Sequence, residues 1–209
     1  MTAKKAFGPD LINPRLIKEA AEVLSYPLQT LFNHSLSTYK FPSQWKRANV
    51  TPVHKKDDPS VLGNYRPISL LSIIGKMMER CIYKYVYNYL TDKSLLSSCQ
   101  SGFRSGDSTI NQLVSISNDI FSALDNGKEI RMVFCDISKA FDRVWHRGLL
   151  SKLQNFGITG KLFDWFSSYL RNRCQHVVIN GKQSNLTYIS AGVPQGPILG
   201  PLLFLIFYK

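Results

Sequence analysis

Asp136 has the sequence setting that most suggests chemistry. An apolar run, residues 130–135, precedes it and the segment DISKAFD begins with it. Such a run predicts a buried strand, and a carboxylate at the end of a strand points into the space beyond the sheet edge. Carboxylate oxygens are ligands that Mg²⁺ accepts in proteins. Taken alone, however, Asp136 is better interpreted as the cap of the helix expected to follow it. Asp142 is expected within that helix, paired locally with Arg143 or Arg147.

Other segments carry residue types that suit phosphate and nucleotide binding. In YRPISLL, residues 65–71, Arg66 lies on an expected strand beside a cationic tip with Lys55 and Lys56, and a guanidinium there could hold a triphosphate. In AGVPQGPILGP, residues 191–201, two glycines flank Pro194-Gln195 and allow the backbone to approach a ligand closely. In QSGFR, Arg104 precedes an expected helix. Each segment also has an ordinary interpretation, as a solvated charge run or a tight turn.

The elements that must position these residues follow from hydrophobic periodicity. We expect helices over residues 14–40 (two, with Pro27 in the first turn of the second), 72–91 and 108–126, and then two more that end near Gly157 and Arg171. Strands are expected over 45–53, 65–70 and 130–135, followed by a hairpin that turns at Asn180-Gly181 and runs toward Ile189, and then a final helix within 192–209. This order predicts an α+β fold and no regular βαβ alternation.

The same periodicity predicts which side chains form the core. Trp145 and Trp165 are assigned to it. The faces expected to be buried are Ile74, Met77, Cys81, Tyr85 and Tyr89 on the helix over 72–91, and Ile110, Leu113, Val114, Ile120, Phe121 and Leu124 on the helix over 108–126.

The composition limits the class of protein. A hydrophobic content of 44% is sufficient for a sizeable core, and a net charge of +12 favours a polyanionic partner such as nucleic acid. The cysteines have no C-x-x-C spacing, which argues against a structural zinc site and favours free thiols in a reducing compartment. The segment MTAKKAFGPD contains no apolar stretch of a signal peptide, and the most apolar stretch, residues 201–208, is too short to span a membrane. We therefore expect an intracellular protein of the nucleus or cytoplasm, neither secreted nor bound to a membrane.

Taken in order, YRPISLL, QSGFR, the expected strand ending in DISKAFD, and GVPQGPILGP closely resemble the reverse transcriptases of non-LTR (LINE-type) retrotransposons. The segments GPDLINPRLIK and PSQWKRANVTPVHKK resemble the N-terminal extension and first finger strands of that family, so the resemblance runs from about Phe7 to Phe207. It implies a right-hand polymerase architecture. The N-terminal extension and fingers would occupy about residues 1–128, and a partial palm would occupy about residues 129–209.

The resemblance also implies roles for individual residues. Asp136 matches the first metal-binding aspartate of the palm, and the backbone carbonyl of Ile137 matches a further metal ligand. Phe141 matches the aromatic steric gate that excludes a 2′-hydroxyl. The remaining matches are Arg66 and either Lys55 or Lys56 at the triphosphate, Gln195 near the nucleotide sugar, Ile68 at the templating base, and Gln100 and Arg104 in or beside the template groove.

What the resemblance implies about function is RNA-directed DNA synthesis with two Mg²⁺ ions, Mn²⁺ being an alternative, and no small-molecule cofactor. The implied partners are an RNA template, a DNA primer and deoxynucleoside triphosphates. Pro197 departs from the family, which has serine there, and Lys209 comes before the family's Asp-Asp hairpin and thumb. We therefore expect a polymerase fragment that is inactive by itself. The alternative is a noncatalytic nucleic-acid-binding remnant or domesticated fragment.

Overall fold

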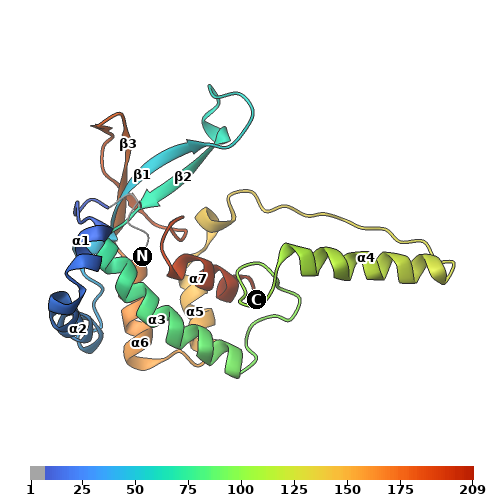
Figure 1. The fold of residues 1–209 in the computed structure, drawn as a ribbon, viewed down its shortest axis with the longest axis horizontal. Coiled ribbons are helices and arrows are strands. Elements are labelled where there is room, and N and C mark those ends of the chain that lie inside the picture. The colour runs from blue at the N-terminus through green and yellow to red at the C-terminus, as the bar shows by residue number, and fades with distance from the viewer. Residues whose placement is uncertain (1–7) are drawn as a thin grey trace.

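The computed structural model describes residues 8–209. The expectations for residues 1–7, which include the lack of a signal peptide and the start of the family resemblance, lie outside the described residues. Strand β1 (Arg47–His54) pairs antiparallel with β2 (Tyr65–Leu70) and parallel with β3 (Arg173–Ile179). Strand β3 also pairs antiparallel with two short strands, β4 (Lys182–Gln183) and β5 (Thr187–Ile189). Figure 1 shows the β1–β2 ribbon projecting from a body of helices.

The helices follow the expected order, which confirms the α+β class. Two of them begin at serine caps: the Oγ atoms of Ser72 and Ser108 accept backbone N–H groups at the starts of α3 and α4. The hairpin after β3 turns at Asn180 and Gly181, both with positive φ, as expected. The bounds are α1 Pro14–Glu19, α2 Ala21–Ser37, α3 Ile73–Asp92, α4 Thr109–Asp125, α5 His146–Asn155, α6 Gly160–Leu170 and α7 Leu199–Tyr208.

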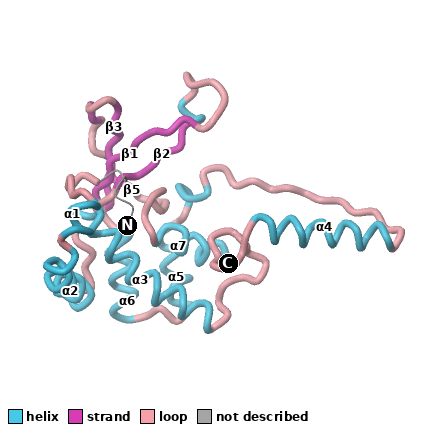
Figure 2. The backbone as a smooth tube through the Cα atoms, in the orientation of Figure 1, coloured by secondary structure: helices cyan, strands magenta, loops and turns pink. Residues whose placement is uncertain are grey.

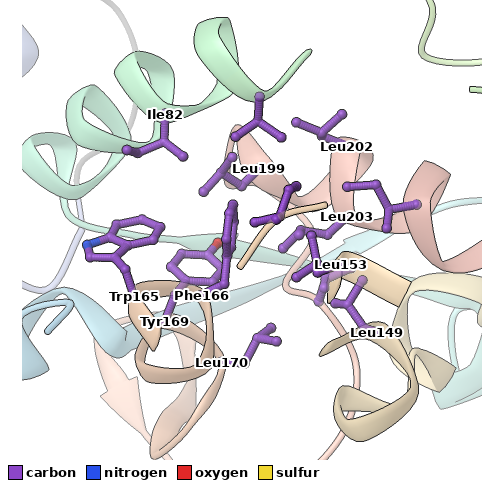
Figure 3. Close-up of a cluster of buried hydrophobic side chains, with 14 of the residues drawn as sticks. Ile82, Leu149, Leu153, Trp165, Phe166, Tyr169, Leu170, Leu199, Leu202 and Leu203 are labelled. Atoms are coloured by element: carbon purple, nitrogen blue, oxygen red, sulfur yellow. The ribbon is translucent and has the colours of Figure 1, made fainter. Parts of the chain in front are cut away.

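The core lies where α7 packs between α3 and α5, with α6 beside them (Figure 3). Trp165 is fully buried, as expected, and its indole N–H donates to Ser35 Oγ over 3.1 Å. Because only residues 196–198 separate the Pro194-Gln195 turn from α7, the packing of this helix also restricts where that turn lies. The fully or nearly fully buried side chains around α7 are Met78, Val86, Leu90, Leu149, Leu153, Phe166, Tyr169, Leu170, Leu202, Leu203 and Ile206.

Two expectations about the helices are wrong. The buried face of α3 carries Met78, Ile82 and Val86, whereas Cys81 and Tyr85 of the expected face are exposed. The residues of both faces have helical spacing, but burying the face of Met78, Ile82 and Val86 leaves no tyrosine hydroxyl that would need a hydrogen-bond partner. The other error concerns Pro27, which lies inside α2 because the chain breaks its helix earlier, at Ala20. An interior proline removes one backbone hydrogen bond, and α2 continues through it.

A second group of errors lies in α4 and residues 126–139, which extend away from the body (Figures 1 and 2). Residues 130–135 form no strand, and Phe134 is 83% exposed. A strand needs a neighbour to take its backbone hydrogen bonds, and the described residues offer this segment none. No residue of α4 is buried, contrary to the expected inward face, and Trp145 is also exposed. No described helix has the length and apolar character needed to cross a bilayer.

Candidate nucleotide-binding site

The turn over residues 192–196 connects three parts of the fold. The backbone N–H of Ser69, on β2, donates to the carbonyl oxygen of Gln195 over 2.8 Å. The N–H groups of Gly192 and Val193 donate to the carbonyls of Val144 and Phe141 over 2.8 and 2.9 Å. One end of the turn therefore holds Gln195 against the β1–β2 ribbon, and its other end is bonded to the backbone of Phe141.

A cavity of about 210 Å³ lies between this turn, β2 and β3. Its polar walls come from both sides, so a ligand there would meet hydroxyl, carboxamide and carboxylate groups together. Of the residues that supply these polar groups, the sequence indicated only Gln195 as a possible ligand contact. Gln175 was missed because it lies within a strand and outside the motifs. The lining residues are Pro67, Ser69, Asp142, Gln175, Ile189, Ala191, Gly192, Val193, Pro194 and Gln195.

Asp142 does not form the expected ion pair with Arg143 or Arg147; no such pair occurs among residues 8–209. It belongs instead to a short 3₁₀ helix, Ala140–Arg143, and lines the cavity. Its backbone is close to Gly192: a Cβ atom added to that glycine would lie 2.9 Å from the Asp142 Cα and carbonyl oxygen. Gly192 also has a φ of +87°.

We predict that Gly192→Ala destabilises the fold by roughly 1–3 kcal/mol more than Gly106→Ala. The two glycines are matched in backbone conformation, since Gly106 has a φ of +83°, but a Cβ atom at Gly106 meets nothing within 4 Å. The comparison therefore separates crowding at the turn from the strain of a positive φ. Urea unfolding of both variants measures the difference. Equal destabilisation would show that the turn does not pack closely on Asp142.

The β1–β2 ribbon carries the residues that the resemblance matches to the triphosphate and the templating base. Arg66 is exposed and Ile68 is half-buried on β2, opposite Val53 and Thr51 of β1. Because side chains alternate along a strand, Arg66 and Ile68 project from the face opposite Pro67 and Ser69, and neither lines the cavity. Arg66 thus lies on the strand that is hydrogen-bonded to the turn of Gln195, but its side chain does not enter the cavity.

Lys55 and Lys56 lie at the tip of the ribbon, as expected, and both are exposed. The tip is closed by the Lys55 N–H, which donates to the Asn64 carbonyl over 2.9 Å. Lys56 Nζ is 4.0 Å from an Asp57 carboxylate oxygen. An exposed pair at that distance contributes little to stability, so both ammonium groups are accessible to a phosphate.

Phe141 is held by other aromatic rings. It stacks on Phe204 of α7 with ring centroids 4.8 Å apart, and Phe103 approaches its edge at 5.8 Å. The ring is half-buried, and its backbone carbonyl accepts from the turn at Val193. Its orientation is therefore fixed by α7 and by the turn that carries Gln195.

Gln100 and Arg104 lie in the connection between α3 and α4 and bond to it. Arg104 Nη1 donates to the Ser97 carbonyl over 2.6 Å, and Gln100 Nε2 donates to the Gly102 carbonyl over 3.2 Å. These bonds stabilise the loop conformation. Neither residue lines the cavity beside Gln195.

Asp136 and Ile137 are exposed in the segment that extends from α4, and within residues 8–209 Asp136 forms no ion pair with the other candidates. The described part of the chain contains no group of three or more His, Cys, Asp or Glu side chains able to hold a metal. Two Mg²⁺ ions need more oxygen ligands than one carboxylate and one carbonyl provide. The residues described thus fit part of the implied metal site and not the whole of it.

A buried polar cluster behind the turn was also missed. Glu79 of α3 is fully buried beside Tyr169 and Arg173, where burial raises its pKa and Arg173 acts in the opposite direction. Lys46 is near the same arginine, and its pKa is lowered by burial first and by Arg173 second. The sequence does contain a signal for Glu79, because it is an acidic residue within the aliphatic stripe of Met78 and Ile82.

Comparison with known proteins adds family relationships to this geometry. A family described as "Reverse transcriptase (RNA-dependent DNA polymerase)" matches residues 53–209. The chain is 37% identical over 205 residues to "RNA-directed DNA polymerase from mobile element jockey" of Drosophila melanogaster and 36% identical to "Probable RNA-directed DNA polymerase from transposon BS" of the same organism. Each alignment covers 98% of this chain and 22% of the relative, so the chain spans about a fifth of the length of these curated relatives.

More distant relatives include a "Retrovirus-related Pol polyprotein from type-1 retrotransposable element R2" of Popillia japonica, which is 27% identical over 164 residues, with 78% of this chain and 22% of that protein covered. Among solved structures, a chain of a "Partial Cas6-RT-Cas1--Cas2 complex" aligns with a TM-score of 0.45 at 16% identity, covering 94% of this chain and 32% of that one.

Proposed function

We propose that this chain binds the incoming nucleotide and the template for RNA-directed DNA synthesis. The premise is its family: the chain belongs to the reverse transcriptase (RNA-dependent DNA polymerase) family and is homologous to non-LTR retrotransposon polymerases. The observation that carries the proposal is the hydrogen bond between Ser69 and Gln195, which joins the finger strand to the glycine-flanked turn. We also propose that about residues 1–128 serve as N-terminal extension and fingers, and residues 129–209 as part of the palm.

In this proposal each residue has a task that suits its position. Arg66, exposed on β2, and the accessible ammonium of Lys55 or Lys56 neutralise the triphosphate. Gln195, in the turn bonded to β2, contacts the sugar, and the fixed ring of Phe141 collides with a 2′-hydroxyl. Ile68, half-buried on β2, contacts the templating base, while Gln100 and Arg104 maintain the loop beside the template.

Reverse transcriptases use divalent metal ions, and we propose Mg²⁺ for this family member, with Mn²⁺ as an alternative. Asp136 would supply a carboxylate oxygen and Ile137 a backbone carbonyl. When bound, the ion would stabilise the negative charge of the triphosphate. Because the described residues contain no larger cluster of acidic side chains, further ligands would have to come from the nucleotide, from water or from protein outside residues 8–209.

A second candidate function is nucleic-acid binding without catalysis. The shortage of metal-ligand oxygens around Asp136 favours this function, whereas the net charge of +12 is consistent with both candidates. The two differ in nucleotide binding: a polymerase part should bind a deoxynucleoside triphosphate opposite a template base, and a noncatalytic remnant need not.

We predict that the chain binds RNA–DNA primer–template duplexes without sequence preference and that its affinity falls steeply with salt. Each phosphate neutralised releases about one counterion, so contact with about six phosphates would lower the affinity by roughly 10³ between about 50 and 200 mM salt. Fluorescence anisotropy at several salt concentrations measures the slope. Lys55→Ala should reduce the slope by about one, whereas Lys18→Ala, on the distant helix α1, should leave it unchanged. Affinity that does not depend on salt, or no binding at low salt, would contradict the proposal.

A further inference from the structure

The segment from Gln195 to Leu199 joins the turn to α7, and it is bonded at both ends. At the first end, Ser69 of β2 bonds the Gln195 carbonyl. At the second end, α7 begins at Leu199, and no side chain from the residues before it caps the helix. The first N–H groups of a helix have no partner within the helix and need one from elsewhere.

Glu79 supplies that partner from another helix. Its Oε2 atom accepts the backbone N–H of Ile198 over 2.7 Å and that of Leu199 over 3.3 Å. The side chain comes from the middle of α3, more than a hundred residues earlier in the sequence. A carboxylate at this position also interacts favourably with the positive end of the helix dipole of α7.

The carboxylate is itself held in place from the opposite side. Its Oε1 atom accepts the Tyr169 hydroxyl over 3.2 Å, and both residues are buried. The Arg173 guanidinium lies over the Tyr169 ring, 4.8 Å from its centroid, and attracts the Glu79 charge. Arg173 Nη1 donates to the Tyr169 carbonyl, so the three side chains form one buried cluster.

We propose that Glu79 is a positioning residue for the nucleotide site: it clamps the start of α7 and thereby fixes the Gln195 turn against β2. The inference rests on the proposed function, because positioning matters only if Gln195 contacts a nucleotide. Glu79 acts through the backbone of Ile198 and Leu199 and touches neither substrate nor metal. The short segment between Gln195 and Ile198 leaves the turn little freedom once both ends are bonded.

The first test uses the unmodified chain. A through-hydrogen-bond scalar coupling between the Ile198 amide nitrogen and the Glu79 side-chain carboxyl carbon, measured by NMR, reports the clamp directly. We expect this coupling to be observed and the Ile198 amide to exchange slowly with solvent. Absence of the coupling together with fast exchange would overturn the proposal, whether or not any variant folds.

The second test uses Glu79→Gln, with Glu22→Gln on the exposed face of α2 as the control of equal charge change. A carboxamide keeps one acceptor oxygen but loses the charge, so the Ile198 and Leu199 amides should exchange at least about tenfold faster. Amides of the core at Leu153 and Trp165 should be unaffected. A general loss of stability would instead accelerate all of them equally and would contradict the local clamp.

A nucleotide titration separates the two proposals. With primer–template bound, Glu79→Gln should weaken the affinity for the matching deoxynucleoside triphosphate about tenfold and leave the primer–template affinity unchanged. Tyr169→Phe, which removes only the hydroxyl bond to Glu79, should have a smaller effect in the same direction. Unchanged nucleotide affinity in Glu79→Gln would overturn the positioning role. If the unmodified chain shows the coupling but binds no nucleotide, the proposed function fails and the positioning role fails with it, while the clamp remains as structure.

Discussion

The 209-residue polypeptide is expected to incorporate deoxynucleotides at least about 10³-fold more slowly than a protein with a complete metal site. Asp136 is a single exposed carboxylate, and the described residues hold no cluster of three potential ligands. Two Mg²⁺ ions bound by one carboxylate and one carbonyl would remain mostly hydrated. The transition-state charge would then lack a stabilising contribution of several kcal/mol.

Incorporation of labelled deoxynucleotide on a primed RNA template, with Mg²⁺ and separately with Mn²⁺, measures this rate. Asp136→Ala is the control, because it removes the carboxylate that we propose binds the metal. We expect both proteins to be inactive. Template-dependent synthesis by the unmodified chain that disappears in Asp136→Ala would show that the chain assembles a sufficient metal site in solution.

The second large effect is expected from Phe141→Ala in a polypeptide extended to the length of its relatives. The ratio of deoxynucleotide to ribonucleotide incorporation should fall at least about tenfold, because discrimination by collision disappears with the ring. Stacking on Phe204 keeps the ring in one orientation in the unmodified protein. Loss of that packing will also lower stability, but a ratio does not depend on the amount of folded protein.

Competition between a deoxynucleotide and its ribonucleotide on the same template gives the ratio in one reaction. Phe121→Ala, an exposed phenylalanine of α4, is the matched control and should leave the ratio unchanged. If Phe141→Ala discriminates as well as the unmodified protein, the match of Phe141 to the steric gate is wrong.

Elements with local signals were predictable from the sequence. Strand β2 has the expected bounds, Tyr65–Leu70, and α4 lies between its cap at Ser108 and the stop at Asn126-Gly127. The hairpin after β3 follows from Asn180-Gly181, whose residues tolerate the positive φ that the turn needs. In each case the residues that determine the boundary are neighbours in sequence.

Features that depend on distant contacts were not predictable in the same way. The sequence around 130–135 has the apolar composition of a strand, but pairing needs a partner strand, and none of the described residues provides one. The choice between two stripes on α3 depends on what α7 presents to it. A periodic pattern specifies that a helix has an apolar face, and the packing partner decides which residues occupy the centre of that face.

The candidate site shows the same division. The residues of the turn and of β2 were identified by resemblance to a family, and the structure adds that the Ser69–Gln195 hydrogen bond joins them. Glu79 and Gln175 were missed because their roles arise from contacts across the fold: Glu79 bonds residues that follow it by 119 and 120 positions. No local pattern encodes such a bond.

Chemical-shift mapping of nucleotide binding tests whether β2 and the turn over residues 192–196 form a nucleotide site. The isotopically labelled chain is saturated with a primer–template and then titrated with the deoxynucleoside triphosphate that matches the template base, with a mismatched one as the control. We expect the matched nucleotide to shift the signals of Arg66, Ile68 and residues 192–196, and the mismatched one to do so only at much higher concentration. No shifts on β2 or the turn, or equal shifts with both nucleotides, would contradict the assignment of this strand and turn as the nucleotide site of a template-directed polymerase.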